Sequence, residues 1–317
     1  MSTKKLDYQF IFVKFPIIFP LIYICTLYLF PSFETELIIL TILFLAEPHF
    51  GATWPFFLNK INKDYIKENK FFLVKIPIII TILCILGFFL AKSFFLLIFF
   101  ASNIYHVTRQ SLGISKLYSS NFDQLNRIEV NLYIWNTIFF LIGFFRFYYP
   151  IITPAYVNIL NVIIVSFLIM NFIYCFLKFK LTDNFFTLIT GVIIFYPICF
   201  VTNPVHAILM GVTMHYSQYL VLTYNVTKHR ELKENPISKN YYFIFVIIFY
   251  SILMTIFSSA GKANSELLKN LIIIPITAQM LHFYLDSRLW KFSENHNRKA
   301  VLGFFLPYFS IDIIRAS

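Results

Sequence analysis

Four histidines lie within long apolar stretches of this sequence: His49, His106, His215 and His282. An ionisable side chain in hydrocarbon is energetically costly, so its presence there points to a functional role. Imidazole is a ligand for iron, copper, zinc and nickel. Four imidazoles gathered at one place would therefore form a metal site.

The spacing of the histidines predicts that they lie at one depth. Each falls in the second arm of a predicted helical hairpin, so the four segments run in the same direction. The histidines come 14, 14, 11 and 17 residues after the predicted segment starts, which are Thr35, Lys92, Pro204 and Ser265. Because an α-helix rises about 1.5 Å per residue, these offsets span only about 9 Å of depth.

The composition predicts a membrane protein. The chain is 59% hydrophobic and 13% charged, with a mean hydropathy of +0.73, which excludes an ordinary soluble domain. Ten apolar stretches approach or reach the length needed to cross a hydrocarbon core of about 30 Å. These are residues 9–30, 35–58, 71–91, 92–118, 128–150, 154–178, 183–203, 204–227, 240–259 and 265–290.

These stretches predict an all-α fold, a polytopic transmembrane helical bundle of about ten spans. The connections between them leave no room for a second soluble domain, so residues 1–317 are expected to form a single integral-membrane domain. The apolar segment at residues 301–314 is too short to span. The tail, residues 291–317, is expected to lie at the interface or to pack back on the bundle.

The net charge of +11 raises the possibility of nucleic-acid binding, but the placement of the charges argues against it. On the ten-span arrangement, 22 of the 26 Lys and Arg residues fall on or nearer the side of the N-terminus. The exceptions are Lys92, Arg146, Lys262 and Lys269. Cytoplasmic loops of membrane proteins carry such an excess. Both termini are therefore expected in the cytoplasm of a multi-pass cell-membrane protein.

Glu47 and His49 flank Pro48 in the second predicted span. On a regular helix the two side chains point in different directions, but a proline distorts the preceding turn and could turn both toward the interior. The alternative is a simple kink with Glu47 paired to a lysine. The functional interpretation is favoured because an unpaired carboxylate in mid-membrane is so unfavourable.

The fourth predicted span carries Asn103, His106, Arg109 and Gln110, which share a helix face. Arg109 needs a partner, for which Glu47 or Asp286 are candidates. The alternative is a hydrogen-bond network that only joins helices.

The eighth predicted span carries His215, Gln218 and Tyr219, and the tenth carries Gln279, His282 and Asp286. Gln218 could orient the ring of His215, since metal-bound histidines usually give their second nitrogen to a hydrogen-bond partner. Asp286, one turn beyond His282, could bind the metal or accept the ring N–H, or it could instead pair with Arg288. Helix–helix contacts without chemistry remain an alternative for both groups.

The ligand types favour iron over other centres. The four cysteines, Cys25, Cys84, Cys175 and Cys199, show no CxxC spacing, and the candidate set contains no thiolate, which argues against copper–thiolate and iron–sulfur sites. Clustered HxxxxH and HxxHH motifs, typical of di-iron desaturases, are missing from the sequence, and a cytochrome b needs histidines at two depths. Four neutral histidines leave open positions on an octahedral iron for dioxygen. A lipid, which can enter sideways between helices, is the expected substrate.

At these residues the sequence resembles the Brp/Blh family of membrane β-carotene oxygenases. Pro48-His49-Phe50-Gly51-Ala52 is similar to the Pro-His-Gly-Ala element of that family, with Phe50 intervening. His106 and His215 follow at separations similar to those of the family's next ligands. The resemblance implies an Fe(2+)-dependent dioxygenase that cleaves a carotenoid such as β-carotene to retinal.

One position departs from the family pattern. The family has a further histidine one turn after its third ligand, where this chain has Tyr219. Either His282 supplies the fourth ligand, or a three-histidine site recruits Glu47. With His49, His106, His215 and His282 as ligands, the expected surrounding groups that serve the chemistry are Glu47, Arg109, Gln110, Gln218 and Asp286.

A carrier is the alternative function. Glu47, His49, Arg109 and Asp286 could instead form a proton relay or bind an anionic solute. Transporters often show inverted repeats and helices broken by glycine or proline. Here the whole chain has only 8 glycines, and the histidine-bearing hairpins repeat in parallel, so the enzyme is favoured. His206, His229 and His296 are poor ligand candidates because they lie near the predicted membrane faces.

Overall fold

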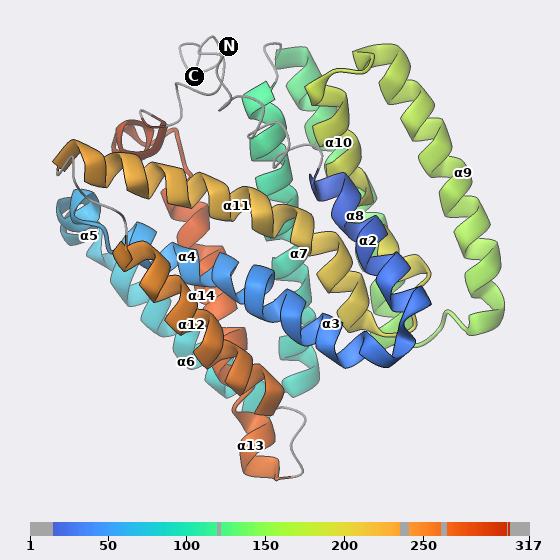
Figure 1. Cartoon of the computed structure of the whole chain (residues 1–317), viewed down its shortest axis with the longest axis horizontal. Coiled ribbons are helices and arrows are strands. Elements are labelled where there is room, and N and C mark those ends of the chain that lie inside the picture. Colours follow the sequence, from blue (N-terminus) through green and yellow to red (C-terminus); the bar gives the residue numbers. More distant parts are fainter. Residues whose placement is uncertain (1–14, 119–121, 235–240, 261–264, 303, 305–317) are drawn as a thin grey trace. The chain divides into compact units, whose positions relative to one another are not determined.

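The computed structural model describes the chain except for residues 1–14, 119–121, 235–240, 261–264, 303 and 305–317. Within the described ranges every regular element is a helix and no strand forms (Figure 1). The predicted all-α class is therefore confirmed.

Six described segments are helical, long and apolar enough to cross a membrane, which indicates a membrane protein. They are Pro31–Phe57, Phe71–Leu90, Asn126–Phe147, Ala155–Lys178, Tyr241–Ala260 and Leu268–Leu289. Two further helices, α7 (Lys92–Tyr118) and α11 (Pro204–Glu234), are 27 and 31 residues long. They match predicted spans in length, but their polar residues lower their hydropathy.

Packing divides the chain into two compact units, each described by itself here. The first comprises Met1–Ile38, Val107–Gln218 and Tyr308–Ser317, and the second comprises Ile39–His106 and Tyr219–Pro307. The boundaries fall within continuous helices, α3, α7 and α11. A single integral-membrane domain over residues 1–317 stays a prediction.

The first unit is built from helices around α8, which contacts α10 and η7. Besides parts of α3, α7 and α11, its elements are α2 (Phe15–Leu29), η2 (Pro31–Phe33), α8 (Phe122–Gly143), η6 (Phe144–Tyr148), α9 (Pro154–Phe179), α10 (Asp183–Ile193) and η7 (Tyr196–Cys199). Of the predicted first span, residues 9–14 lie outside the described part of the chain.

The predicted span at 183–203 is not one continuous helix. It consists of α10 (Asp183–Ile193) and the short turn η7. Pro197 lies within η7, where it cannot donate a backbone hydrogen bond to extend the α-helical ladder. The end of α10 packs closely on α11, because the carbonyl oxygen of Ile194 lies 1.6 Å from where a Cβ on Gly211 would be.

The second unit contains the helices that carry three of the four histidines. Its elements, besides parts of α7 and α11, are α3 (Glu34–Thr41), η3 (Ile42–Ala46), α4 (Glu47–Phe57), η4 (Lys60–Asn62), α5 (Lys63–Glu68), η5 (Phe71–Lys75), α6 (Ile76–Leu90), α12 (Tyr241–Ala260), α13 (Glu266–Asn270), α14 (Ile273–Leu289), α15 (Asn295–Asn297) and η8 (Arg298–Leu302). Of α3, only residues 39–41 belong to this unit, whereas residues 34–38 belong to the first. Within it, α4 packs on α12 and α14 packs on α6.

The described part of the tail packs back on the second unit. Arg230, near the end of α11, donates from Nε and Nη2 to the carbonyl of Ala300 at 2.8 and 2.6 Å. Its guanidinium also lies 4.5 Å from the centroid of the Phe56 ring. The short turn η8 is therefore fastened to the ends of α4 and α11.

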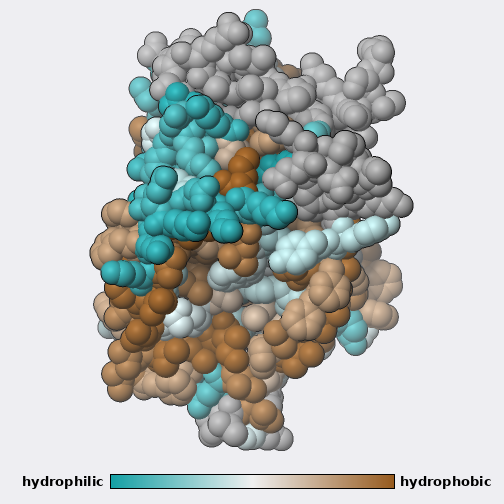
Figure 2. All heavy atoms as spheres, turned by 90° about the vertical axis from the view of Figure 1, so that its left-hand side faces the viewer, coloured by the Kyte–Doolittle hydropathy of each residue, from teal (hydrophilic) through white to brown (hydrophobic). Residues whose placement is uncertain are grey.

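The surface of the second unit separates polar from apolar side chains, as a membrane boundary requires. Figure 2 shows hydrophilic residues gathered above a hydrophobic region. The exposed charged residues of α5 and its flanks include Lys60, Lys63 and Lys67, whereas α6 and α12 expose Leu83, Phe89, Phe245 and Phe249. Large apolar side chains on the outside of a helix suit contact with lipid.

We expect Gly211→Ala to destabilise the protein strongly. An added Cβ would meet the Ile194 backbone oxygen at 1.6 Å, and because backbone cannot rotate away, the helices must separate. Overpacking of this kind costs about 3 kcal/mol or more. Thermal unfolding of the purified protein measures the effect.

Gly113→Ala is the matched control, because nothing lies within 4 Å of a Cβ added at Gly113 on α7. Alanine at this helical position should leave stability unchanged or raise it by up to about 1 kcal/mol. Equal melting temperatures for the two variants would contradict the close packing of α10 on α11.

Candidate metal centre

His49 lies on α4, directly after an irregular stretch of helix. The turn η3 (Ile42–Ala46) is π-helical, and the N–H of Glu47 donates to the carbonyl of Ile42, five residues earlier. Pro48 follows, and it has no N–H with which to continue the ladder. Single π-helical turns inside α-helices occur frequently at functional sites. The local sequence therefore places His49 just beyond a break in helical regularity.

Helices α4 and α14 run parallel and in register beside the site. The ring centroids of His49 and His282 are 4.5 Å apart, and one turn later Thr53 Oγ1 lies 3.4 Å from Asp286 Oδ1. A further turn on, the rings of Phe56 and Trp290 stack at 5.5 Å. Successive turns of α4 therefore contact successive turns of α14 in the same order, as two parallel helices do.

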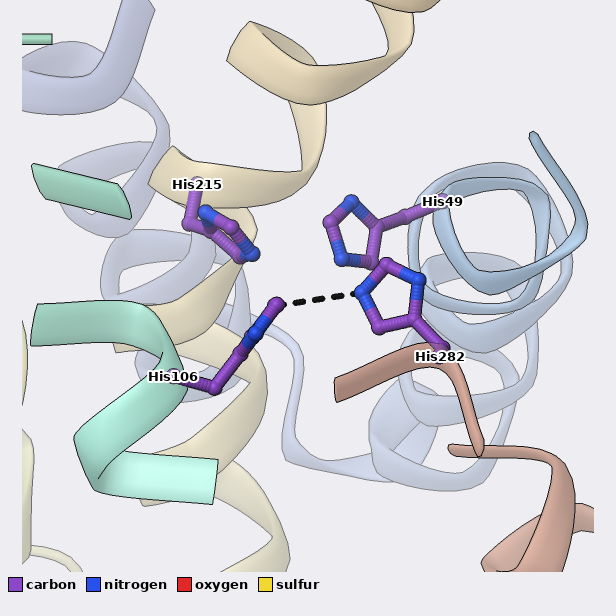
Figure 3. Close-up of side chains that lie close together, drawn as sticks. All are labelled: His49, His106, His215 and His282. Atoms are coloured by element: carbon purple, nitrogen blue, oxygen red, sulfur yellow. Dashed lines mark hydrogen bonds between the residues drawn. The ribbon is translucent and has the colours of Figure 1, made fainter. Parts of the chain in front are cut away.

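Helix α7 brings His106 to the same place and runs in the same direction as α14. Near the start of α7, Phe95 packs in one apolar cluster with Ile273 of α14. Farther along both helices, Nε2 of His106 and Nε2 of His282 are 3.1 Å apart, within hydrogen-bond distance (Figure 3). The parallel course predicted for these histidine-bearing segments is therefore seen for α4, α7 and α14.

His215 completes the group from α11, one turn before Tyr219. The Tyr219 ring lies 4.5 Å from the His49 ring. Taking one nitrogen from each ring, the four histidines offer ligand atoms that all lie within 4.8 Å of one another. Figure 3 shows their imidazoles turned toward one another.

This arrangement could hold a metal ion. Metal–nitrogen bonds of about 2.0–2.1 Å would bring the ligating nitrogens of a loaded site roughly 3–4.5 Å from one another, so small side-chain movements suffice. The fractional exposures of His49, His106, His215 and His282 are 0, 6, 2 and 0%. Buried imidazoles free of competing water are suited to binding a transition metal.

A chain of hydrogen bonds fixes the ring of His282. Tyr219 donates its hydroxyl proton to Asp286 Oδ1 at 2.6 Å, so its oxygen can accept from Thr53 at 2.8 Å. Thr53 Oγ1 lies 2.6 Å from His282 Nδ1. In the tautomer that carries its proton on Nδ1, His282 donates to Thr53, and the lone pair of Nε2 is left for a metal. This is the outer support that metal-bound histidines require.

Thr53 is the residue beside the histidines that the sequence prediction missed. It follows His49 by four positions, the same spacing by which Asp286 follows His282 and Tyr219 follows His215. That repeated spacing was the available signal. Asp286 was expected to bind the metal or accept the ring N–H directly, but here it ends the chain that begins at His282 Nδ1. Its Oδ2 lies 3.7 Å from His282 Nε2.

Glu47 points away from the histidines, toward α12. The carboxyl group is 2% exposed and is hydrogen-bonded by the side chain of Ser258. The helix break before Pro48 therefore does not turn Glu47 and His49 onto one face, as the sequence had suggested it could. Both side chains are buried, but on different sides of α4.

Arg109 forms an ion pair that the sequence did not predict. Its Nη1 lies 3.4 Å from Glu129 Oε1 on α8, and its side chain is 48% exposed. Gln218 is buried on α11, and Gln110 is half-buried on α7. The proposed roles of these two amides beside the metal stay predictions.

The three remaining histidines lie in other surroundings. His206 Nδ1 is 2.8 Å from the Tyr23 hydroxyl, and its Nε2 is 2.9 Å from Glu34. His229 Nδ1 contacts the Asn225 carbonyl at 2.7 Å, and His296 Nε2 contacts Asn62 at 3.0 Å.

Comparison with known protein families, with characterised proteins and with solved structures finds no match to this chain. The assignment of a function therefore depends on the residues and the geometry of the site.

We expect the purified protein to contain one transition-metal ion per chain after gentle extraction, measured by elemental analysis. His49→Ala and His282→Ala should each lower the metal content, because each removes a ligand from a buried set. His229→Ala is the control and should retain the metal. Less than one ion per chain in the wild type would contradict the metal centre.

We expect Thr53→Val to weaken metal binding by about 10–100-fold, the usual effect of losing an outer partner of a histidine ligand. Valine fills the same space but cannot accept the Nδ1 proton of His282. Thr53→Ser, which keeps the hydroxyl, should bind nearly as tightly as the wild type. Competition with a chelator of known affinity measures both, and equal affinities for the two variants would rule out the orienting role.

Proposed function

We propose that the chain is a membrane-embedded non-haem iron oxygenase that acts on an apolar lipid. The substrate proposed is a carotenoid such as β-carotene, cleaved oxidatively to retinal. The observation that carries the proposal is the buried group of four histidines with ligand atoms within 4.8 Å of one another. The resemblance of the residues around His49 to the Brp/Blh family supports the choice of reaction.

The donor set fits iron. All four proposed ligands are neutral imidazoles, a ligand type that suits iron. Such an ion, when bound, supplies open positions at which dioxygen is activated. The balanced reaction adds one O₂ across a carbon–carbon double bond and yields two aldehydes, so no external reductant is needed.

Residues of the chain provide the surroundings that such a reaction needs. The chain from Asp286 through Tyr219 and Thr53 holds the His282 ring in one orientation. Around the histidines lie aromatic side chains: the Phe283 ring is 4.7 Å from His106, and the Phe50 ring is 5.1 Å from His282. Aromatic faces exclude water and suit a rigid, unsaturated apolar chain.

The proposal includes a topology. We propose about ten membrane segments in the cell membrane, with both termini cytoplasmic. The excess of Lys and Arg on one side of this arrangement supports the orientation. The helices α7 and α11, although more polar than the six apolar spans, supply His106 and His215, and a polar face turned inward is what a buried metal site demands.

Expression in cells that accumulate β-carotene tests the function. We expect the orange colour to fade and retinal to appear, measured by chromatography of extracted pigments. His106→Ala and His215→Ala should preserve the colour, because each removes a metal ligand. His229→Ala, which changes a histidine outside the group, should cleave the pigment like the wild type.

The outcome of this experiment distinguishes failure of the proposed substrate from failure of the proposed metal site. Unchanged pigment in cells that make iron-loaded protein would reject carotenoid cleavage while leaving the metal site intact. Pigment loss that persists in His106→Ala and His215→Ala would reject both the metal site and its role in carotenoid cleavage.

A further inference from the structure

Arg288, near the end of α14, lies where the membrane segment Phe71–Leu90 begins. Its guanidinium carbon is 4.5 Å from the centroid of the Phe72 ring and 5.6 Å from that of the Tyr284 ring. The Tyr284 hydroxyl donates to the Phe72 carbonyl at 2.8 Å, which fastens this end of α14 to η5. Two aromatic rings and this hydrogen bond therefore hold the guanidinium at one place on the second unit.

The charge of Arg288 is not matched by an ion pair. In the part of the chain that the structure describes, no salt bridge involves this half-buried side chain. Glu294 is near enough for the two charges to interact, but its carboxylate already accepts from Tyr65 and Lys291. Ring faces attract a guanidinium without occupying its N–H groups as a carboxylate would. These N–H groups are therefore available to an anion.

Two exposed lysines add positive charge beside Phe72. Lys70 precedes it by two positions and Lys75 follows it by three, and the chain is helical across all of them. At a rise of about 1.5 Å per residue, the two lysines are separated by only about 8 Å along the helix. Among the described residues neither lysine forms an ion pair. Charges within about 8 Å of one another are only partly screened at physiological salt, so these act together on a ligand.

The three cations lie at the boundary between the polar and the apolar surface of the second unit. Before this boundary α5 exposes charged side chains, whereas α6, beyond it, exposes large apolar ones in successive turns. Figure 2 shows the change from hydrophilic to hydrophobic surface on this unit. The exposed residues that share one face of α6 are Ile79, Leu83, Leu86 and Leu90. Because α6 runs from the boundary into the apolar region, an acyl chain can extend along it.

We propose that Arg288, Lys70 and Lys75 bind the headgroup of an anionic glycerophospholipid of the surrounding bilayer. A guanidinium and a phosphate form paired, charge-assisted hydrogen bonds, and basic groups at a membrane surface attract anionic lipids. Three cations favour a headgroup without an ammonium group of its own, such as phosphatidylglycerol. The phosphate lies at Arg288 and the acyl chains lie along α6.

This site is separate from the histidines. Arg288 follows His282 by six positions, which is about 9 Å along α14. The proposal goes beyond the oxygenase function and does not depend on it.

Native mass spectrometry of the purified full-length protein in mild detergent tests the site. We expect dioleoyl phosphatidylglycerol to bind with an affinity at least about fivefold higher than dioleoyl phosphatidylcholine. Arg288→Gln should weaken phosphatidylglycerol binding by about tenfold or more, as the loss of a charge-assisted hydrogen bond predicts. Lys70→Gln and Lys75→Gln should each weaken it by about fivefold, because each removes one charge at the membrane surface.

Arg127→Gln is the matched control. Arg127 is an exposed arginine of α8 on the same predicted side of the membrane, so the substitution removes the same charge elsewhere. This variant should bind phosphatidylglycerol like the wild type. Thermal unfolding gives a second readout: phosphatidylglycerol should raise the melting temperature of the wild type and of Arg127→Gln. The rise should be smaller for Arg288→Gln. If Arg288→Gln does not fold, the two lysine variants decide, since both side chains are exposed.

Three results would overturn the proposal. The first is equal affinity of the wild type for the two lipids. The second is equal weakening of phosphatidylglycerol binding in Arg127→Gln and in the variants of the site. The third is displacement of the bound lipid by an equal concentration of glycerol phosphate, which would assign the site to a soluble phosphate. Reduced lipid binding in Arg288→Gln at wild-type metal content would locate the defect in the lipid site alone.

Discussion

Burying an imidazole among apolar helices leaves two ring nitrogens that both need partners, and water is not there to provide them. This constraint organises the second unit. At His282 one nitrogen is occupied by Thr53, so the other is directed at the neighbouring histidines. The neighbouring polar groups are satisfied in turn. The Thr53 hydroxyl is hydrogen-bonded to the Tyr219 hydroxyl, which donates to the Asp286 carboxylate. Each group in that chain can donate only because the next one accepts.

Helix α4 contacts different groups on its two sides. On one side of α4, His49 and Thr53 face α14 and α11. On the other side, Glu47 and Gly51 face α12. Gly51 matters because the Tyr250 ring occupies the space that a side chain would fill, which lets α12 approach closely. Pro48 and the π-helical turn before it lie between the two faces, so this one irregular turn sets the direction of both.

Some of this arrangement could be predicted from the sequence. Hydropathy and the offsets of the histidines within their segments predicted an all-helical membrane protein with imidazoles at one level, because depth follows from counting residues along a helix. Direction around the helix axis was harder to predict. A π-helical turn rotates everything after it, and Glu47 therefore had no predictable face. The partner of Arg109 also escaped prediction, since any carboxylate on a neighbouring helix was possible until the packing was known. Thr53 was missed because a threonine in an apolar helix ordinarily bonds to its own backbone.

The parallel register of α4 and α14 has a consequence for biosynthesis. Thr53 and His282 touch across 229 positions of sequence, and a growing chain makes these residues in order. When α4 has just been synthesised, α14, which carries partners of His49 and Thr53, has not yet been made. Any stage at which α4 is already inserted must therefore hold its polar side chains by provisional contacts or near the interface. Assembly of the four-histidine group is then a late event, because the group is incomplete until α14 arrives.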